Sequence, residues 1–232
     1  MKRLHITAEG QTEERFVNDC LVAHLAPLGV YADVRMVLTS EDNKNGVEYR
    51  GGFRRKNAYC TVKKDITNWL KEDRDPNCFF TTMFDYYALP EDFPGFAVAE
   101  TKQDKYERIQ IIETALKLDI HDPRFIPYIQ LHEFETLIFV DPQALDWEYL
   151  EHEKAIEKLI KIAEEYENPE LINNHPETAP SKRIISLIPE HAGNKLAGAM
   201  IAQKIGIPQL KKHCKHFSSW IQQLESLDGL CL

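Results

Sequence analysis

The chain has 232 residues, of which 43% are hydrophobic and 28% are charged, and its formal net charge is −9. This composition is typical of a globular protein, and the negative charge argues against a general nucleic-acid coat protein, because phosphate binding requires cations. No apolar run approaches the ~20 residues that span a bilayer, so we expect no membrane partner.

The expected compartment follows from the first residues and from the cysteines. The sequence starts directly with a strand pattern, without the apolar core of a signal peptide. Its five cysteines are scattered and have no CxxC spacing, which indicates neither a zinc site nor a disulfide framework. We therefore expect reduced thiols in a cytoplasmic protein.

Strand and helix patterns alternate through the first half of the chain. Short apolar runs predict strands over residues 3–8 and 30–38, and helical spacing predicts a helix over residues 12–26 between them. Residues 40–56 are polar and rich in Gly and Asn, which predicts a loop. Loops longer than about 12–15 residues are usually functional or disordered, so this segment is a candidate for function.

The same alternation continues after the loop. A helix is predicted over residues 58–72, followed by an apolar strand over 78–84 of the kind that parallel sheets bury on both faces. A helix over 103–118 and a strand over 124–131 come next, and residues 136–140 either continue that strand or form a fifth. This order predicts a three-layer, Rossmann-like α/β sandwich with a mainly parallel sheet of four to five strands.

The sequence changes character at about residue 142, after which no strand pattern is convincing. Helical patterns, separated by prolines, occupy residues 142–149, 153–166, 181–188, 194–204 and 208–225. We therefore predict an α/β domain over residues 1–141 and a C-terminal helical part over residues 142–232 that packs on it.

Acidic residues follow three of the predicted strands. Glu9 comes after the first, Asp85 after the third, and Glu133 and Glu135 after the fourth. Parallel strands end at one edge of a sheet, where open α/β folds bind their ligands, so we expect these carboxylates to converge. Clustered carboxylates repel one another unless a cation or a shared proton relieves them, and oxygen ligands suit Mg²⁺ or Mn²⁺. The pattern therefore predicts a metal site for phosphoryl transfer.

Structural explanations for these residues stay open. Glu9 could belong to a strand-to-helix turn whose acids merely favour the helix dipole. If their segment is extended, Glu133 and Glu135 point to one face and His132 points to the other. His132 is a general acid or base by type, although a histidine in an apolar run is more often a hydrogen-bonded core residue.

Cations are concentrated in two places, both candidates for contacts with nucleic acid. The first group lies in the predicted loop and consists of Arg50, Arg54, Arg55 and Lys56. For any single one of these residues, a solvated loop with ordinary charges is the better explanation, although a local basic patch can operate on an acidic protein. Lys182 and Arg183 lie in the first turn of a predicted helix, where cations oppose the helix dipole. An ion pair with the acidic edge or a phosphate contact explains them better.

Five motifs of the chain resemble, in order, those of the TOPRIM-like domain-of-unknown-function family 4276. These motifs are Glu9-Gly10-Gln11-Thr12-Glu13, Asp85-Tyr86-Tyr87-Ala88-Leu89-Pro90, His132-Glu133-Phe134-Glu135-Thr136-Leu137, Pro180-Ser181-Lys182-Arg183-Ile184 and Phe217-x-x-Trp220. The resemblance covers essentially the whole chain. It implies a relation to the TOPRIM domains of topoisomerases, primases and OLD-type nucleases, which hold Mg²⁺ with a glutamate after the first strand and an Asp-x-Asp after the third.

The match to the TOPRIM metal site is incomplete. Glu9 matches the glutamate and Asp85 the first aspartate, but Tyr87 stands where the second aspartate belongs. Glu133 or Glu135 could supply the lost carboxylate from the neighbouring strand. The resemblance thus implies Glu9, Asp85 and Glu133 as ligands of Mg²⁺ or Mn²⁺.

Two classes of function follow from this resemblance. The first is a metal-dependent nuclease or phosphoryl-transfer component that acts on DNA or RNA, with Glu9, Asp85, Glu133, Glu135 and Lys182 as its catalytic residues. The family's genes often lie beside ABC-type ATPases, which implies such an ATPase as a partner and phage defence as a setting. The second class is a non-catalytic TOPRIM-like partner or regulatory subunit of an ATPase, which the missing aspartate and the negative charge favour.

Overall fold

The computed structural model describes residues 1–42, 45, 47–53, 56–172, 176–194 and 196–229. Its centre is a five-stranded sheet in the order β2-β1-β5-β6, with β7 also paired to β5, and every pairing is parallel. The strands are β1 (Lys2–Ala8), β2 (Val30–Met36), β5 (Cys78–Asp85), β6 (Phe125–Ile126) and β7 (Ile129–Gln130). The prediction of a mainly parallel sheet is confirmed.

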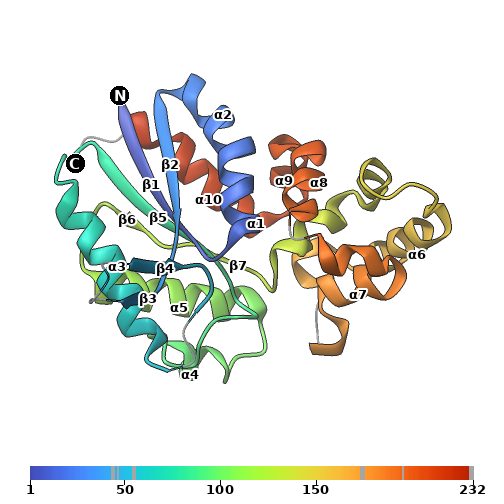
Figure 1. Ribbon diagram of the computed structural model, residues 1–232, viewed down its shortest axis with the longest axis horizontal. Helices are drawn as coiled ribbons and strands as arrows, with labels where there is room; N and C mark the ends of the chain where they lie inside the picture. Colours follow the sequence, from blue (N-terminus) through green and yellow to red (C-terminus); the bar gives the residue numbers. More distant parts are fainter. Residues whose placement is uncertain (43–44, 46, 54–55, 173–175, 195, 230–232) are drawn as a thin grey trace.

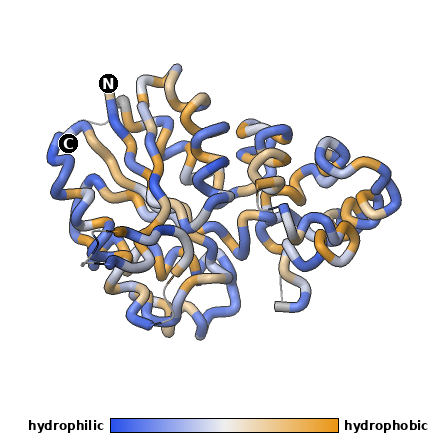
Figure 2. The backbone as a smooth tube through the Cα atoms, viewed as in Figure 1, coloured by the Kyte–Doolittle hydropathy of each residue, from blue (hydrophilic) through white to orange (hydrophobic). Residues whose placement is uncertain are grey.

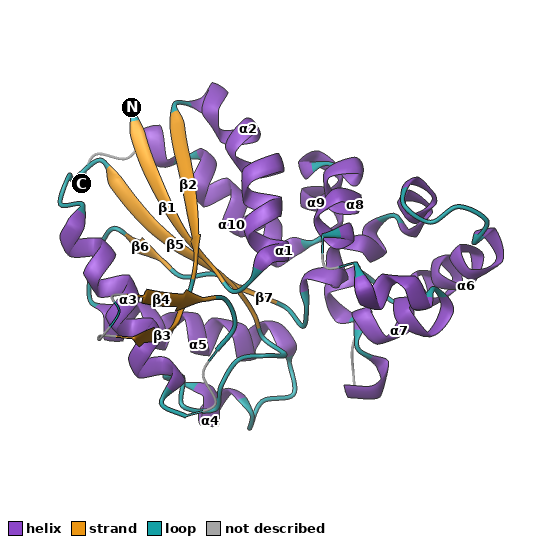
Figure 3. Ribbon diagram, in the orientation of Figure 1, coloured by secondary structure: helices purple, strands orange, loops and turns teal. Residues whose placement is uncertain are grey.

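Helices cover both faces of this sheet (Figure 1, Figure 3). One face packs against the helical segment that contains α1 (Gln11–Phe16) and α2 (Val22–Leu25), and against α10 (Lys215–Glu225). The other face packs against α3 (Ala58–Glu72) and α5 (Lys105–Ile120). The molecule is therefore the three-layer α/β sandwich that the sequence predicts, and Figure 2 shows hydrophobic stretches along its central strands.

The predicted helix over residues 12–26 is present, with an irregular middle. A π-helical turn, Val17–Leu21, joins α1 to α2, and Gly29 ends the segment in a left-handed conformation with φ 76°. Phe16 and Leu25 are fully buried in the core on this face of the sheet. The apolar spacing thus specified the helix and its buried side, but not the wider turn within it.

The prediction of a loop over residues 40–56 is wrong in part. β3 (Leu38–Asp42) and β4 (Val47–Arg50) pair as an antiparallel hairpin beside α3. The four residues of β4 are mostly exposed, including Val47 and Tyr49. A hairpin that buries so little has no apolar alternation, so its polar composition resembles that of a loop.

The segment after α5 also differs from its prediction. The strand expected over residues 124–131 is two short strands, β6 and β7, on either side of Pro127. Residues 136–140 belong to a 3₁₀ helix, η3 (Phe134–Val140), and neither continue a strand nor form a fifth. Most of η3 is buried on every side, and a short apolar run of this kind does not distinguish a strand from a helix.

The helices beyond residue 142 form the right-hand part of Figure 1, except for α10, which returns to the sheet. They are α6 (Glu153–Glu164), α7 (Pro180–Leu187), α8 (Ala197–Ile205) and α9 (Ile207–His213). The indole N–H of Trp220 in α10 donates a hydrogen bond to Thr81 of β5 at 3.0 Å. The sheet and the C-terminal helices therefore share one core.

None of the helices in the described part of the chain is both long and apolar enough to cross a membrane.

Candidate functional site

Two of the predicted site residues meet where neighbouring strands end. Glu9 directly follows β1, and Asp85 is the last residue of β5. The N–H of Asp85 donates a hydrogen bond to Oε2 of Glu9 at 2.9 Å. The expected convergence of these two carboxyl groups at one edge of the sheet is confirmed.

The acids of the third motif, Glu133 and Glu135, reach the same edge by a different route from the one predicted. Glu133 immediately precedes η3 and Glu135 lies in its first turn, so the two glutamates are not on one face of an extended strand. The N–H of Phe134 donates to Oδ2 of Asp85 at 3.1 Å, which fixes the start of η3 against β5. The N–H of Ser181, at the start of α7, donates to Oε2 of Glu133 at 2.9 Å.

Glu13 is a fifth acid at this edge, and sequence reasoning did not select it. It lies in α1, only 6% of its surface is exposed, and its Oε2 accepts a hydrogen bond from the N–H of Gly10 at 2.9 Å. An acid in the first turn of a helix is usually explained by the helix dipole. The signal that could have identified it is its position one turn after Glu9, at the same strand-to-helix junction.

We refer to Glu9, Glu13, Asp85, Glu133 and Glu135 as the acidic cluster. Burial, followed by the charge of Glu13, raises the pKa of Glu9 to about 8. Burial, followed by the charge of Glu133, raises the pKa of Glu135 to about 7. Burial and the charges of Glu13 and Glu9 hold the pKa of Asp85 well above its ordinary value. Without a cation, part of the cluster therefore retains protons at neutral pH.

The acidic cluster has no basic residue to balance it within the described part of the chain. No lysine or arginine contributes to the pKa shifts of Glu9, Asp85 or Glu135. The ion pair found there joins Nε2 of His191 to Oε1 of Glu135 at 3.9 Å, and burial lowers the pKa of His191, which favours its neutral form.

One carboxylate oxygen of the cluster lacks a partner altogether. Oδ1 of Asp85 is buried and accepts no hydrogen bond, an arrangement that costs free energy unless a ligand is bound. The chemistry of the donors, all carboxylate oxygens, fits a hard divalent cation. The carboxylates are spread more widely than a closed metal cage, since no three of their oxygens all lie within 4.8 Å of one another. Waters or a substrate phosphate would complete the coordination.

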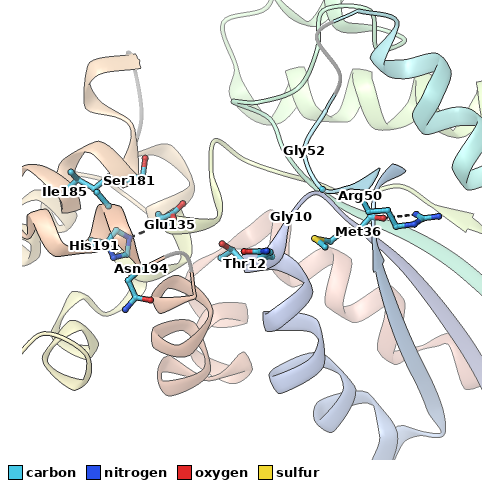
Figure 4. A pocket seen from close by; sticks show the side chains of 13 residues that line it. Gly10, Thr12, Met36, Arg50, Gly52, Glu135, Ser181, Ile185, His191 and Asn194 are labelled. Carbon is cyan, nitrogen blue, oxygen red and sulfur yellow. Dashed lines mark hydrogen bonds and ion pairs between the residues drawn. The ribbon is translucent and has the colours of Figure 1, made fainter. Parts of the chain in front are cut away.

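A cavity of about 450 Å³ opens beside the acidic cluster (Figure 4). Gly10 and Thr12 lie in its middle, between residues of the C-terminal helices and residues around the β3–β4 hairpin. The lining consists of Gly10, Gln11, Thr12, Met36, Arg50, Gly51, Gly52, Glu135, Ser181, Ile185, His191, Ala192 and Asn194. The N–H of Gly52 donates to the carbonyl oxygen of Glu9 at 2.8 Å, so the chain after the hairpin is held against the acidic cluster.

The basic residues of the hairpin segment are only partly available to a ligand. Arg50 lines the cavity, but its guanidinium group pairs with Asp65 at 3.1 Å and with Glu48 at 2.8 Å. Lys56 is exposed and lines a different hollow, next to Phe53. Arg54 and Arg55 lie outside the described residues.

The two cations of α7 differ in their surroundings. Arg183 donates to the carbonyl oxygen of Thr178 at 2.7 Å and to the hydroxyl of Tyr166 at 3.0 Å, so it forms no ion pair with the acidic cluster. Lys182 is exposed, next to Ser181 on the cavity wall. The ion pair that sequence reasoning allowed between this helix and the acids is thus replaced by the hydrogen bond from Ser181 to Glu133.

His132 is buried, as a core histidine should be, but it is not hydrogen-bonded as expected. Its Nε2 has no partner, and its backbone adopts a left-handed φ of 65°. Burial, followed by the charges of Lys105 and Arg108, lowers the pKa of His132 to about 3. The ring is therefore neutral, and it does not line the cavity.

Comparison with known proteins gives one match. The family model described as "Domain of unknown function (DUF4276)" matches residues 8–225, a range that contains the whole acidic cluster and every residue that lines the cavity. No curated protein and no solved structure matches the chain.

Proposed function

The chain belongs to the DUF4276 family, and we propose that it is a Mg²⁺- or Mn²⁺-dependent TOPRIM-like nuclease or phosphoryl-transfer component that acts on nucleic acid. The observation that carries the proposal is the acidic cluster: five carboxyl groups converge without a lysine or arginine partner among the described residues, and Oδ1 of Asp85 is buried and unpaired. Such an arrangement costs stability and is usually retained for a ligand.

The role of each acid follows from its position. Glu9 and Asp85 would hold the cation, and Glu133 or Glu135 would take the place of the aspartate that Tyr87 replaces. When bound, a divalent cation activates water and neutralises charge on a phosphate. Glu13 would keep a proton or share one with Glu9, since burial raises its pKa. The third carboxylate would thus come from the start of η3, because Tyr87 has no carboxyl group.

Phosphate contacts would come from the rim of the cavity. Lys182 is exposed at the start of α7 and is the cation of that helix that supports the proposal, because Arg183 is bonded to Thr178 and Tyr166. On the opposite wall Arg50 would have to share its charge with Asp65. Arg54, Arg55 and Lys56 follow the hairpin and would extend the contact along a strand.

We propose that the protein works with a partner. An ABC-type ATPase, as the resemblance implies, would bind and separate the nucleic acid. Phage defence in the cytoplasm is the setting that we propose.

The alternative function is a non-catalytic module that docks on such an ATPase. The exposed apolar side chains of Trp147, Leu150 and Met200 on the helical part favour a docking role, as does the net charge of −9.

The test is metal-dependent cleavage by the purified protein, alone and with its ATPase partner. Wild type should cleave DNA or RNA only when Mg²⁺ or Mn²⁺ is present, and Glu9→Gln should abolish cleavage because the amide keeps the shape but loses the charge. Glu14→Gln, one residue beyond Glu13 but outside the acidic cluster, is the matched control and should remain active. Full activity in Glu9→Gln would contradict the catalytic assignment, and inactivity of wild type under every condition would favour the docking module.

A further inference from the structure

A second group of potential metal ligands lies near the amino ends of the central strands, away from the acidic cluster. It consists of His5 in β1, Asp73 just after α3, and Cys78 at the start of β5. One nitrogen, one oxygen and one sulfur atom of these side chains all lie within 4.8 Å of one another. Among the described residues this is the tightest such set, and it combines three ligand types.

The orientation of His5 suits metal binding through Nε2. Asp33 lies directly opposite His5 in the β1–β2 pairing and contacts Nδ1 of its ring. The ring is stacked on Trp69, with the ring centroids 4.6 Å apart, so its plane is fixed. A carboxylate on one ring nitrogen, with the other nitrogen directed at a metal, is the usual arrangement of a ligating histidine.

The contact on the other side of His5 is made with a carboxylate. Nε2 lies 3.2 Å from Oδ2 of Asp73. When Nδ1 carries the ring proton toward Asp33, Nε2 presents a lone pair to a carboxylate oxygen, and two acceptors repel one another. Arg3, which pairs with the same oxygen at 2.8 Å, relieves part of this repulsion, and a metal ion between Nε2 and Oδ2 would relieve the rest.

Asp73 and Cys78 are placed to share such an ion with His5. The N–H of Asp75 donates to Oδ1 of Asp73 at 3.1 Å, and Oδ2 of Asp73 faces both Nε2 of His5 at 3.2 Å and the guanidinium group of Arg3 at 2.8 Å. Arg3 also contacts Oδ1 of Asp73 at 2.8 Å and Asp75 at 3.3 Å, so it can keep these partners when Oδ2 binds a metal. Cys78 is fully buried.

We propose that His5, Asp73 and Cys78 bind one Zn²⁺ ion, with water in the fourth position, and so tie β1, β5 and the end of α3 together. Imidazole, carboxylate and thiolate together favour Zn²⁺ over Mg²⁺, because sulfur is a soft ligand. Burial keeps the Cys78 thiol protonated in the metal-free protein, with a pKa of about 12. Binding therefore releases that proton to solvent as the Zn–S bond forms. The proposal does not depend on the acidic cluster.

Cobalt provides the test, because Co²⁺ replaces Zn²⁺ and reports its ligands by absorbance. Full-length protein freed of metal should bind Co²⁺ with a thiolate-to-cobalt charge-transfer band in the near ultraviolet, and one equivalent of Zn²⁺ should remove the band. Excess Mg²⁺ should not. Cobalt at the acidic cluster would have only oxygen ligands and would give no such band, so the two sites are distinguishable in wild type.

Matched variants then identify the ligands. Cys78→Ser should lose the charge-transfer band, whereas Cys214→Ser, another fully buried thiol, should retain it. Asp33→Asn should weaken Co²⁺ binding by about 10- to 100-fold, as expected for the partner of a ligating histidine, and Asp146→Asn, in the helical part, should change it far less. Absence of the band in wild type would overturn the proposal even if Cys78→Ser fails to fold, and so would a band that persists in Cys78→Ser.

Discussion

The two ends of the central sheet both gather acidic residues, but among the described residues only the amino end supplies them with an arginine partner. Burial raises the pKa of Asp73, but the N–H of Asp75, His5 and Arg3 outweigh it, and its pKa lies below the ordinary value. At the carboxyl end the pKa values of Glu9, Asp85 and Glu135 are raised instead. Acidic side chains are thus stabilised as carboxylates at the amino end of the sheet, whereas their protonated form is favoured at the carboxyl end.

A buried acid elsewhere shows that this fold can neutralise carboxylates when it needs only stability. Asp65 is 3% exposed, and Arg35 and Arg50 pair with it at 3.0 Å and 3.1 Å. The acidic cluster has no such arrangement among the described residues. Unrelieved repulsion costs folding free energy, and this cost at one edge of the sheet is the reason for our proposal that a cation binds there.

The largest expected effect is on activity. Asp85→Asn should reduce metal-dependent cleavage by more than about 100-fold, because even residues that merely support metal ligands are worth about 10- to 100-fold. Asp75→Asn makes the same chemical change at the amino end and should leave cleavage at the wild-type rate. Equal losses in the two variants, measured in the same cleavage assay, would remove the functional distinction between the two ends of the sheet.

A smaller effect is expected on stability in the presence of metal. At 100 times its dissociation constant, Mg²⁺ should stabilise the folded protein by ~2.7 kcal/mol, because it binds the folded state only. Urea unfolding with and without Mg²⁺ measures this difference. The stabilisation should vanish in Asp85→Asn and persist in Glu14→Gln, and a gain that survives in Asp85→Asn would place the bound Mg²⁺ outside the acidic cluster.

The pH dependence of stability should differ in sign between the two ends. The pKa of Glu9 is about 8 in the folded state, against an ordinary value of 4.5, so the folded state binds more protons between these values. Stability in metal-free buffer should therefore fall as the pH rises through this window, by up to about 1.4 kcal/mol per pH unit for each such carboxyl. The lowered pKa of Asp73 acts in the opposite sense, and its contribution is lost only as the pH falls from 3.8.

Urea unfolding between pH 5 and pH 8 checks this sign. Glu9→Gln and Glu135→Gln, combined, should flatten the dependence because glutamine does not titrate. A metal-free wild type that becomes more stable toward pH 8 would show that the acids are relieved by a partner, and the contrast with the amino end would disappear.

The smallest effect is on the binding of nucleic acid. Lys182→Ala should weaken binding of DNA or RNA and reduce the slope of log K against log salt by about 0.7–0.9, because one phosphate contact releases about that number of counterions. Arg183→Ala is the informative comparison, since Arg183 is bonded within the protein, and it should leave the salt slope unchanged. The reverse result would assign the phosphate contact to Arg183 after rearrangement of its side chain.

Residues that follow apolar strands were the most predictable part of the site. Glu9 and Asp85 could be placed together because two buried strands end at them, and parallel pairing then brings them to one edge. Glu133 and Glu135 were placed at the right edge, but only Glu133 has the extended backbone that was considered for both. Glu135 lies in a 3₁₀ helix that is mostly buried, and hydrophobicity alone does not specify the period of such a segment.

Other parts of the site depend on contacts that sequence spacing does not reveal. Glu13 has an ordinary position for a helix start, and only its burial beside Glu9 makes it unusual. His5, Asp73 and Cys78 come from three segments, so a search for regularly spaced cysteines misses them. The β3–β4 hairpin escaped prediction for a related reason, because its side chains face solvent and leave no apolar pattern.

The return of α10 to the sheet has a consequence for how the protein is made. Phe217 and Trp220 of α10 complete the core on the face of the sheet that β1 shares with α1 and α2, and His24 in α2 contacts Glu225 in α10 at 2.7 Å across a separation of 201 residues. During synthesis one face of β1 therefore stays uncovered until α10 has left the ribosome. Contacts over such a sequence separation slow folding, so the chain exposes apolar surface that favours aggregation before α10 emerges.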